Sequence, residues 1–423
     1  MPAVNSKTDA ASTEAKAKKQ QLRLVQIHCA INMAVSMMNF TSRGILLQEV
    51  LGGDYSKVAG YMSTWTGVTA LIEFCLNPTL GKLSDAYGRK TFMVIAPYAA
   101  LVLKTIVLMF PSVSTLTLER IVCDGLRTMS GTTMGSAAIT DLVPKDQLGK
   151  AYSELWAWMG IAIIGSPLLA SRMSARGSYV AALLLASVQL VADQFYLKET
   201  LPREKRKAFP GFANPLEVFR LFNSGKTLQT ASALTALQNM LDPKILADFW
   251  IILQLEGLQW SSSQSQLFTG FIGFGLIAGR KITSWGLDKY GIHGFTTMCH
   301  YVNAVEMFLI GLLPSTMTMG VSSLLGFMSG QKSNGVKQML AKAAFDRQKT
   351  TRDFGNGELS GLQANLRALM VSISPFLYAA FYRAGKNRGM KGGAFIGAAI
   401  VVMCAEMMHK RLRSQLKEIV IAE

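Results

Sequence analysis

Charge is scarce in this sequence of 423 residues, since Asp, Glu, Lys and Arg together make up 16% of it. Soluble globular domains carry roughly 25% charged residues. Half of the residues are apolar, and the mean hydropathy is +0.27. Apolar runs of about 20 residues, the length that a membrane-spanning helix needs, recur between short charged segments. The composition argues against two or three soluble domains and predicts a multi-pass membrane protein.

Cysteine and histidine are also scarce. The five cysteines fall in separate apolar runs, without the C-x-x-C spacing of a redox or metal site. The four histidines form no H-E-x-x-H pair, and no nucleophile–base constellation is evident. We therefore expect neither an enzyme nor a bound metal or other cofactor.

Basic residues exceed acidic ones by 17. No basic stripe with interleaved aromatic residues is present, so we expect no nucleic-acid partner. The bases gather at alternate loops, as they do on the cytoplasmic side of membrane proteins. With the N-terminus inside, 28 bases fall on inner segments and 8 on outer ones. This predicts that both termini are cytoplasmic, although it does not distinguish a plasma membrane from an organelle membrane.

Twelve membrane helices are predicted from the apolar runs, which makes the expected fold class an all-α membrane protein. The expected helices cover about 22–47, 55–80, 91–110, 116–142, 150–172, 178–197, 228–256, 263–285, 295–313, 318–343, 358–382 and 391–410.

The polar segments between and beside these runs predict the domain organisation. The first residues lack the apolar core of a signal peptide, and their Ala, Ser, Thr and Lys content predicts disorder. The longest polar connection holds three prolines and indicates a linker between two six-helix halves. The expected divisions are a disordered cytosolic tail over 1–21, a six-helix bundle over 22–197, a cytosolic linker over 198–227, a second bundle over 228–410 and a cytosolic tail over 411–423.

A short motif recurs once in each expected half. Residues 81–90 read Gly-Lys-Leu-Ser-Asp-Ala-Tyr-Gly-Arg-Lys, and a weaker copy, Asp-Lys-Tyr-Gly, ends at Gly291. The two aspartates, Asp85 and Asp288, lie 203 positions apart. Two Ser-Pro pairs, starting at Ser166 and Ser374, are offset by 208. These offsets predict a duplicated fold whose halves are parallel repeats with a cavity between them.

These residues resemble the major facilitator superfamily of transporters. The signature after its second helix runs Gly-x-Leu-(Ala/Ser)-Asp-(Arg/Lys)-x-Gly-Arg-(Arg/Lys), and only Ala86 departs from it here. The resemblance implies a latch, meaning residues that hold helices together while the cytoplasmic side is closed. The aspartate is also placed to meet the N-terminus of the eleventh helix, whose dipole favours an anion. The expected gating residues are Gly81, Leu83, Asp85, Gly88, Arg89, Lys90, Asp288 and Gly291.

Within that superfamily the chain most resembles the drug/proton antiporters, including the tetracycline exporters. The matching segments lie over 70–78, 120–125, 137–141, 199–202, 214–216 and 357–375. Two features depart from the exporters. Asn32 stands where they carry an acid on the first helix, and Lys104 lies beside the place of a missing acid on the third.

Charged residues inside the apolar runs are the candidates for coupling, because a charge at a bilayer centre costs roughly 2.5–3.5 kcal/mol on the most lenient scale. Arg120, Asp124 and Arg127 share one helical face with Gly131. The resemblance makes Arg120 the residue that holds or modulates a coupling carboxylate. A self-neutralising ladder that only fixes helix packing is the alternative.

Glu73 is the candidate titratable group, because burial raises and a nearby base lowers the pKa of a carboxyl group. We expect it either to exchange partners between Arg120 and Lys104 or to form a static pair with Lys104.

Polar residues on the remaining helices are expected to line a central cavity for the solute. Near Pro243 a proline-broken stretch frees backbone carbonyls, which is tolerated where a helix lines a cavity; a bend at a membrane edge is the alternative. For the tryptophans of the fifth helix, packing is the alternative to stacking on a solute. The candidates are Asn32, Asn39, Trp156, Gln238, Asn239, Asp242, Gln331, Asn334 and Asn365.

Three functions fit these observations. The first is a monomeric secondary transporter that exports a small organic solute through the lipid bilayer by alternating access, in exchange for protons. The second is a uniporter or symporter for an anionic metabolite, suggested by the excess of bases within helices. The third is a receptor or scaffold on the same fold that transports nothing. The bases behind the second alternative are Lys104, Arg120, Arg127, Lys244, Lys332, Lys337 and Arg367.

Overall fold

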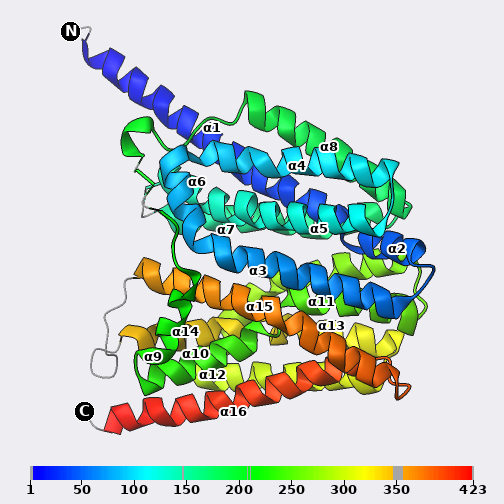
Figure 1. Cartoon of the computed structure of the whole chain (residues 1–423). Coiled ribbons are helices and arrows are strands. Elements are labelled where there is room, and N and C mark those ends of the chain that lie inside the picture. The colour runs from blue at the N-terminus through cyan, green and yellow to red at the C-terminus, as the bar shows by residue number, and fades with distance from the viewer. Residues whose placement is uncertain (1–2, 145–146, 207, 210, 346–355, 422–423) are drawn as a thin grey trace. The chain divides into compact units, whose positions relative to one another are not determined.

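The computed structural model describes residues 3–144, 147–206, 208–209, 211–345 and 356–421. Every regular element in these residues is helical (Figure 1), which confirms the all-α prediction. The chain divides into two compact units. Unit 1 comprises Met1–Leu46 and Thr79–Phe212, and unit 2 comprises Leu47–Pro78 and Ala213–Glu423.

Unit 1 is a helical bundle in which α1 packs against α7 and α8, and α4 against α5 and α8. Two of its helices begin at serine caps, which satisfy backbone N–H groups at the helix start. Ser112 forms a capping box with Thr115 before α5, and Ser174 caps α8. Its elements are α1 (Ala3–Met38), the first part of α2 (Phe40–Val50), α4 (Arg89–Met109), α5 (Val113–Thr128), η1 (Met129–Thr133), α6 (Met134–Leu142), α7 (Leu148–Ala170), α8 (Ala175–Phe195) and η3 (Arg203–Lys205).

Unit 2 is a second bundle, in which α12 packs against α13 and α16, and α10 against α14 and α16. The helix α12 is two helices joined at Gly291, where φ is 65°. The elements of unit 2 are α3 (Tyr55–Tyr87) up to Pro78, η4 (Pro215–Phe219), α9 (Arg220–Asn223), α10 (Lys226–Asn239), α11 (Pro243–Ile252), η5 (Leu253–Gly257), α12 (Ser262–Leu312), α13 (Thr316–Ser329), α14 (Lys332–Phe345), α15 (Asn356–Lys386) and α16 (Gly393–Ile421).

All twelve predicted segments are helical over most of their length in the described part of the chain. Four of them are interrupted, including that over 22–47, which breaks at Asn39 between α1 and α2. The segment over 116–142 contains the π-helical turn η1, that over 228–256 breaks before Pro243, and that over 318–343 breaks between α13 and α14. Such turns often mark functional positions. Among the described helices, five are long and apolar enough by themselves to cross a membrane: Arg89–Met109, Lys150–Ala170, Ala175–Phe195, Gly361–Lys386 and Gly393–Leu416.

The two segments that were expected to be cytosolic tails are helical in the described residues. The helix α1 already begins at Ala3, and α16 continues to Ile421, where tails over 1–21 and 411–423 were expected. The Ala, Lys, Gln, Glu and Leu residues of these stretches have high intrinsic helix propensity. They therefore extend the adjoining membrane helices.

The expected N-terminal bundle also differs, because Leu47–Pro78 belongs to unit 2. Side chains of α3 explain this assignment. Thr66 donates a hydrogen bond to Asp248 of α11 at 2.6 Å, and the buried Phe74 lies in the same hydrophobic core as Leu362 and Leu366 of α15.

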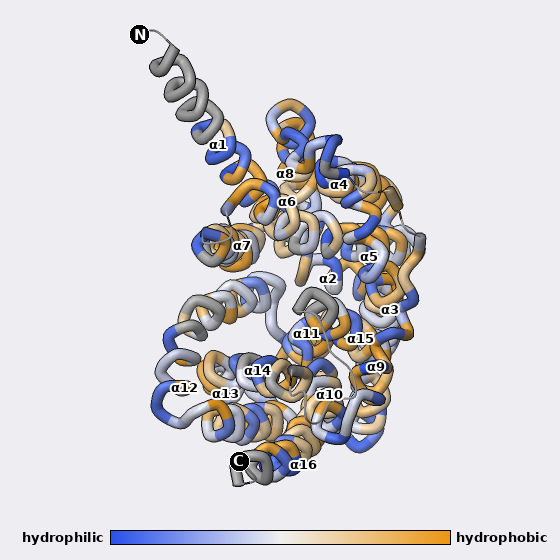
Figure 2. Tube along the Cα trace, turned by 90° about the vertical axis from the view of Figure 1, so that its left-hand side faces the viewer, coloured by the Kyte–Doolittle hydropathy of each residue, from blue (hydrophilic) through white to orange (hydrophobic). Residues whose placement is uncertain are grey.

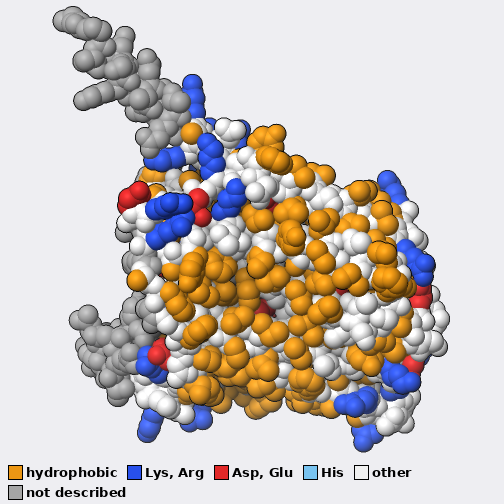
Figure 3. Space-filling model, turned by 45° about the horizontal axis from the view of Figure 1, so that its top comes forward, with side chains coloured by type: hydrophobic (Ala, Val, Ile, Leu, Met, Phe, Trp, Pro, Cys, Tyr) orange, Lys and Arg blue, Asp and Glu red, His pale blue; other side chains and the backbone are white. Residues whose placement is uncertain are grey.

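Large hydrophobic side chains lie exposed along α4 and α8, among them Tyr98, Met109, Leu184 and Phe195. Figure 3 shows many hydrophobic side chains at the surface, with most of the charged ones gathered toward its edges. Figure 2 shows hydrophobic stretches recurring along the helices of both units. An exposed apolar surface of this kind is what lipid contact requires, since exposed patches on soluble monomers stay small.

Candidate functional site

The turn between α3 and α4 carries the motif over 81–90. Gly88 adopts φ +96°, a left-handed conformation that residues with a Cβ atom rarely adopt, and an added Cβ atom would collide with the Glu199 carboxylate. The next residue, Arg89, is buried. Its Nη2 lies 2.5 Å from Asp85 Oδ1, and its Nη1 donates to the hydroxyl of Ser84. The turn therefore places the arginine of the motif inward, against its own aspartate.

Two further acids hold this turn from other segments of unit 1. Arg89 Nε lies 3.2 Å from Asp141 Oδ2 at the end of α6. The Glu199 carboxylate accepts from the backbone N–H groups of Arg89 at 2.9 Å and Lys90 at 3.3 Å. It thus caps α4, where the helix dipole favours an anion. The superfamily-like motif over 81–90 therefore meets two segments, 137–141 and 199–202, that resemble the drug/proton antiporters.

The weaker copy of the motif in unit 2 forms a similar backbone turn with fewer contacts. Gly291 also has positive φ and joins two helices. Asp288 is exposed and accepts one long hydrogen bond of 3.5 Å from Ser284. Ile292 follows the glycine, at the position that Arg89 holds in the first copy.

The predicted gating residues Gly81, Leu83 and Lys90 lie at the surface or half-buried on α3 and α4. Lys90 Nζ donates to the carbonyl of Gln194 at 3.1 Å.

Buried charges of unit 1 gather around Glu119 on α5, which is fully buried. Arg43 contacts both of its carboxylate oxygens, with Nε–Oε2 at 2.9 Å and Nη2–Oε1 at 3.1 Å. Lys104 Nζ lies 2.7 Å from Oε1, and the hydroxyl of Tyr179 donates to Oε2 at 3.4 Å. A carboxylate with two cations and a phenol around it keeps its negative charge in the interior, because removing any partner would leave an uncompensated charge.

The predicted face of Arg120, Asp124 and Arg127 is present next to this group. Arg120 Nε lies 2.9 Å from Asp124 Oδ2, and Arg127 Nε lies 3.9 Å from Asp124 Oδ1. Arg43 Nη1 also approaches Asp124, at 3.8 Å. The ladder alternative therefore describes the observed contacts of these residues.

The expected pairing of Glu73 with Lys104 differs from the structure. Lys104 contacts Glu119 of its own unit, whereas Glu73 Oε1 lies 2.8 Å from Lys244 Nζ on α11 in unit 2. By charge alone, Lys104, Arg120 and Lys244 are equally suitable partners for Glu73. Only the fold decides which acid reaches which base.

A second ion pair of unit 2 involves Asp242, which lies two residues before Lys244 in the sequence. Asp242 caps α11 by accepting from the backbone N–H of Lys244 at 2.9 Å, and its other oxygen lies 2.6 Å from Arg367 Nε on α15. The Arg367 side chain remains 55% exposed, whereas that of Asp242 is 8% exposed. The break at Pro243 therefore places a buried acid against an accessible base.

The predicted cavity residues divide into anchoring and accessible ones. Asn365 donates to the carbonyl of Pro215 at 2.7 Å, and Gln238 donates to that of Lys332 at 3.3 Å. Asn32 lies 3.4 Å from the hydroxyl of Ser130 in the π-helical turn. These buried amides therefore join α15 to the linker, α10 to α14 and α1 to η1.

The other cavity candidates are more varied. Asn39 is buried and, with its amide turned over, accepts from Lys104 Nζ at 2.8 Å. Gln331 accepts from Thr283 at 3.0 Å. Asn239 is half-buried, Trp156 is 53% exposed on α7, and the side chain of Asn334 lies outside the described residues.

Two hollows open on the described surface. One of about 350 Å³ lies in unit 2 between the start of α3 and the end of α15, where Ser56, Gly60, Phe376 and Tyr382 line it. Another of about 510 Å³ lies in unit 1 beside Lys90 and Glu199. Neither contains a predicted coupling residue, so neither identifies a solute site.

Two groups of residues escaped the sequence prediction. Glu119 lay just off the Arg120 face, and Arg43 was counted with an outer loop although it is buried on α2. In unit 2 the fold also brings together His300, Glu406 and His409, whose ligand atoms all lie within 4.8 Å of one another. The sequence signal for them was a Glu-x-x-His spacing on one helix, which helical-bundle metal sites use.

Sequence comparisons place the chain in one transporter family and among one group of its members. A family model described as the Major Facilitator Superfamily matches residues 29–375. The class C tetracycline resistance protein of Escherichia coli is 23% identical over 370 residues, covering 86% of this chain and 90% of the relative. The class G tetracycline resistance protein of Vibrio anguillarum is 23% identical over 393 residues, covering 88% and 92%.

Solved structures show the same fold at low identity. The human organic anion transporter MFSD10 (TETRAN) superimposes with a TM-score of 0.65 at 16% identity, covering 93% of this chain and 99% of the other. The nucleoside transporter NupG gives a TM-score of 0.68 at 12% identity, covering 94% and 99%.

Proposed function

Because this chain belongs to the Major Facilitator Superfamily, a family of membrane transporters and not of enzymes, we propose that it exports a small organic solute by alternating access in exchange for protons. Tetracycline-class compounds are the first solutes to test, since its curated relatives are tetracycline resistance proteins. The expected partners are the solute, protons and the lipid bilayer.

The contact between Glu73 and Lys244 carries the proton-coupling part of the proposal. Their side chains are 9% and 19% exposed, so this pair is less enclosed than the Glu119 group of unit 1. An acid that releases its proton while facing a base, and takes it up when the base moves away, changes charge with conformation. The pair lies beside the helix break at Pro243, where backbone geometry is already irregular.

Asp242 and Arg367 supply a second component of the proposal, a group that binds anions. Arg367 is the half-exposed base of this region, and a guanidinium group binds carboxylate or phosphate in bidentate fashion. This favours the alternative function, a uniporter or symporter for an anionic metabolite, whose signature is flux limited to organic anions.

Flux into proteoliposomes, with and without an imposed pH gradient, tests the proposal. We expect gradient-driven tetracycline flux in the wild type, and loss of the gradient's effect in Glu73→Gln. Glu217→Gln is the matched control, because Glu217 forms an exposed pair with Arg220 at 3.1 Å in the same unit. It should behave as the wild type.

Three outcomes would separate the alternatives. Flux of any solute that ignores the gradient and survives Glu73→Gln would refute proton antiport. Flux limited to organic anions and abolished by Arg367→Gln would favour the anion transporter. No flux across a panel of tetracyclines, organic anions and nucleosides, with monodisperse protein, would favour a receptor or scaffold.

The motif over 81–90 supports a further part of this proposal, the cytoplasmic latch. Asp85 is half-buried whereas Arg89 is buried. The aspartate can therefore make a further contact when the protein closes.

A further inference from the structure

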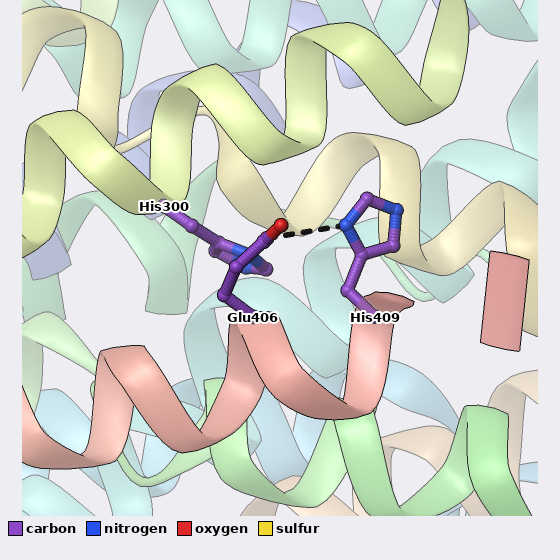
Figure 4. Close-up of side chains that lie close together, drawn as sticks. All are labelled: His300, Glu406 and His409. Atoms are coloured by element: carbon purple, nitrogen blue, oxygen red, sulfur yellow. Dashed lines mark hydrogen bonds and ion pairs between the residues drawn. The ribbon is translucent and has the colours of Figure 1, made fainter. Parts of the chain in front are cut away.

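Three of the four histidines of the chain lie in one group in unit 2. His300 comes from the second half of α12, and Glu406 and His409 come from α16 (Figure 4). All three are at most 2% exposed. His293, one helical stretch before His300, lies with its Nδ1 3.2 Å from His409 Nε2.

The two buried imidazoles face the same carboxylate atom. His300 Nδ1 lies 2.7 Å from Glu406 Oε2, and His409 Nδ1 lies 3.2 Å from that oxygen. The other oxygen, Oε1, accepts from the hydroxyl of Thr297 at 3.1 Å. Two imidazole nitrogens and one carboxylate therefore converge from two helices on one buried point.

We propose that His300, Glu406 and His409 bind one divalent transition-metal ion, with Zn²⁺ as the ion that fits best. Two imidazoles and a carboxylate are a common ligand set for zinc. They suit the borderline-soft first-row ions better than Mg²⁺ or Ca²⁺, which prefer all-oxygen sites.

The distances require little movement to accept the ion. Zinc–ligand bonds of about 2.0–2.1 Å in a tetrahedron place neighbouring ligand atoms roughly 3.3 Å apart. The two histidine–glutamate separations of 2.7 and 3.2 Å are close to that value, and all three ligand atoms lie within 4.8 Å of one another. The hydroxyl of Thr297 lies 3.3 Å from His409 Nδ1. This hydroxyl or a water molecule can take the fourth coordination position.

Outer partners orient both rings, as metal-binding histidines require. The Nε2 atom of His409 faces His293 Nδ1, which can accept its proton. The Nε2 atom of His300 lies 2.8 Å from the amide of Gln238. Binding of the ion by Nδ1 protonates Nε2, so the Gln238 amide must turn its oxygen to the ring to accept that hydrogen bond, giving up its own 3.3 Å bond to the carbonyl of Lys332.

His293 links the buried ligands to the exposed turn of α12. Gly291 and Ile292 are exposed, and His293 is half-buried between this surface and His409. His293 therefore provides a first ligand from which an ion can pass inward. Once bound, the ion joins α12 to α16, and it stabilises the folded chain because the unfolded chain has no such preformed site.

Unit 1 contains a matched site with one ligand fewer. His28 Nδ1 lies 2.8 Å from Asp193 Oδ2, almost the same distance as in the His300–Glu406 pair, and both side chains are buried. Where unit 2 has a second histidine, unit 1 has the amide of Gln189, which lies 3.1 Å from His28 Nδ1. His28→Gln thus removes a comparable buried pair without touching the proposed metal site.

Metal content of the full-length chain, purified in detergent without a histidine tag, tests the proposal. After treatment with a chelator, the protein is titrated with Zn²⁺ alone, and bound zinc is counted by mass spectrometry of the dialysed sample. We expect about one ion per chain and a higher thermal midpoint. Co²⁺ in place of zinc should give a visible absorption band of a nitrogen- and oxygen-coordinated ion.

The variants distinguish this site from weak surface binding. Glu406→Gln and, separately, His409→Gln should each lower zinc affinity at least about 10-fold, since even outer-partner changes cost 10–100-fold. Gln238→Leu should lower it by about 10-fold, and His28→Gln should leave it unchanged. Wild-type protein that holds no zinc, or zinc binding that survives in both ligand variants, would overturn the proposal. Should a ligand variant be aggregated, the wild-type stoichiometry and cobalt spectrum decide alone.

Discussion

Units 1 and 2 differ in how far the ion pairs of their buried carboxylates are enclosed. In unit 1, Glu119 and Asp141 contact arginine or lysine side chains. In unit 2, Glu73 and Asp242 contact Lys244 and Arg367, whereas Glu306 accepts from an asparagine and a serine, and Glu406 from histidines and a threonine.

This difference suggests a division of labour between the units. The charges of unit 1 are mutually neutralising and enclosed, so they determine how its helices pack. The ion pairs of unit 2 include accessible members, Lys244 and Arg367, whose side chains are 19% and 55% exposed. We therefore expect substitutions in unit 1 to act mainly on stability and those in unit 2 mainly on transport.

The largest expected effect is on Glu119. In Glu119→Gln, Arg43 and Lys104 keep their buried charges without the carboxylate, and the free energy of unfolding should fall by about 3–5 kcal/mol. Glu306→Gln in unit 2 keeps a hydrogen-bonding group beside Asn303 and Ser329 and should cost about 1 kcal/mol. Chemical denaturation in detergent measures both. Equal losses would break the comparison between the units.

A smaller stability effect is expected at the two copies of the turn. Arg89→Ala leaves Asp85 and Asp141 without their base and should cost about 2 kcal/mol, less than for an enclosed pair because Asp85 is partly exposed. Ile292→Ala, at the matching position in unit 2, should cost less than about 0.5 kcal/mol. Thermal midpoints of the two variants check this, and a larger loss for the isoleucine variant would contradict it.

The same turns should differ in their effect on conformation. Asp85→Asn should shift the balance toward the inward-facing state by a few-fold without abolishing expression, since it removes the anion of the proposed latch. Asp288→Asn should shift it less, because Asp288 is exposed with one long contact. Labelling of single cysteines on the cytoplasmic side of the chain measures accessibility. An unchanged balance in Asp85→Asn would refute the latch.

The smallest expected effect concerns Asp54, in the exposed turn before α3. Hydrogen bonds from the backbone N–H groups of Lys57 and Ser56 lower the pKa of its carboxyl group below the usual value of 3.8. A lowered folded pKa adds stability that is present above the unfolded pKa and is lost as the pH falls through the folded one.

Hydrogen exchange of the first turn of α3 tests this capping role. Asp54→Ala should exchange faster than the wild type at pH 7, and the difference should shrink as the pH falls below about 4. Lys57→Met should matter less, because its ammonium group lies 3.4 Å from the aspartate and both are exposed. A larger effect of Lys57→Met would show that the ion pair, and not the backbone, holds Asp54.

Local sequence patterns predicted much of the fold. Apolar runs placed all twelve helical segments, because a helix in lipid must satisfy its own backbone and expose apolar side chains. The glycines at 88 and 291 predicted tight turns that have positive φ in both units. The ladder of Arg120, Asp124 and Arg127 could also be predicted, since residues three or four apart on a helix are neighbours.

Partners that lie far apart in the sequence could not be predicted in the same way. Lys104 is as compatible with Glu73 as with Glu119 by charge, and only packing brings it to Glu119. The break at Pro243 could be predicted from its proline, but the π-helical turn η1 could not; there the hydroxyl of Ser130 donates to the carbonyl of Met93 on α4 at 2.6 Å.

The sequence by itself determined that this is an all-α membrane transporter with a repeated turn, because hydropathy and turn chemistry act over a few neighbouring residues. The tertiary structure alone decided which charges meet. It joined Arg89 to Asp141, Glu73 to Lys244 and His300 to Glu406 across 52, 171 and 106 positions. Contacts over such separations depend on how whole helices pack, and no local pattern of residues encodes that packing.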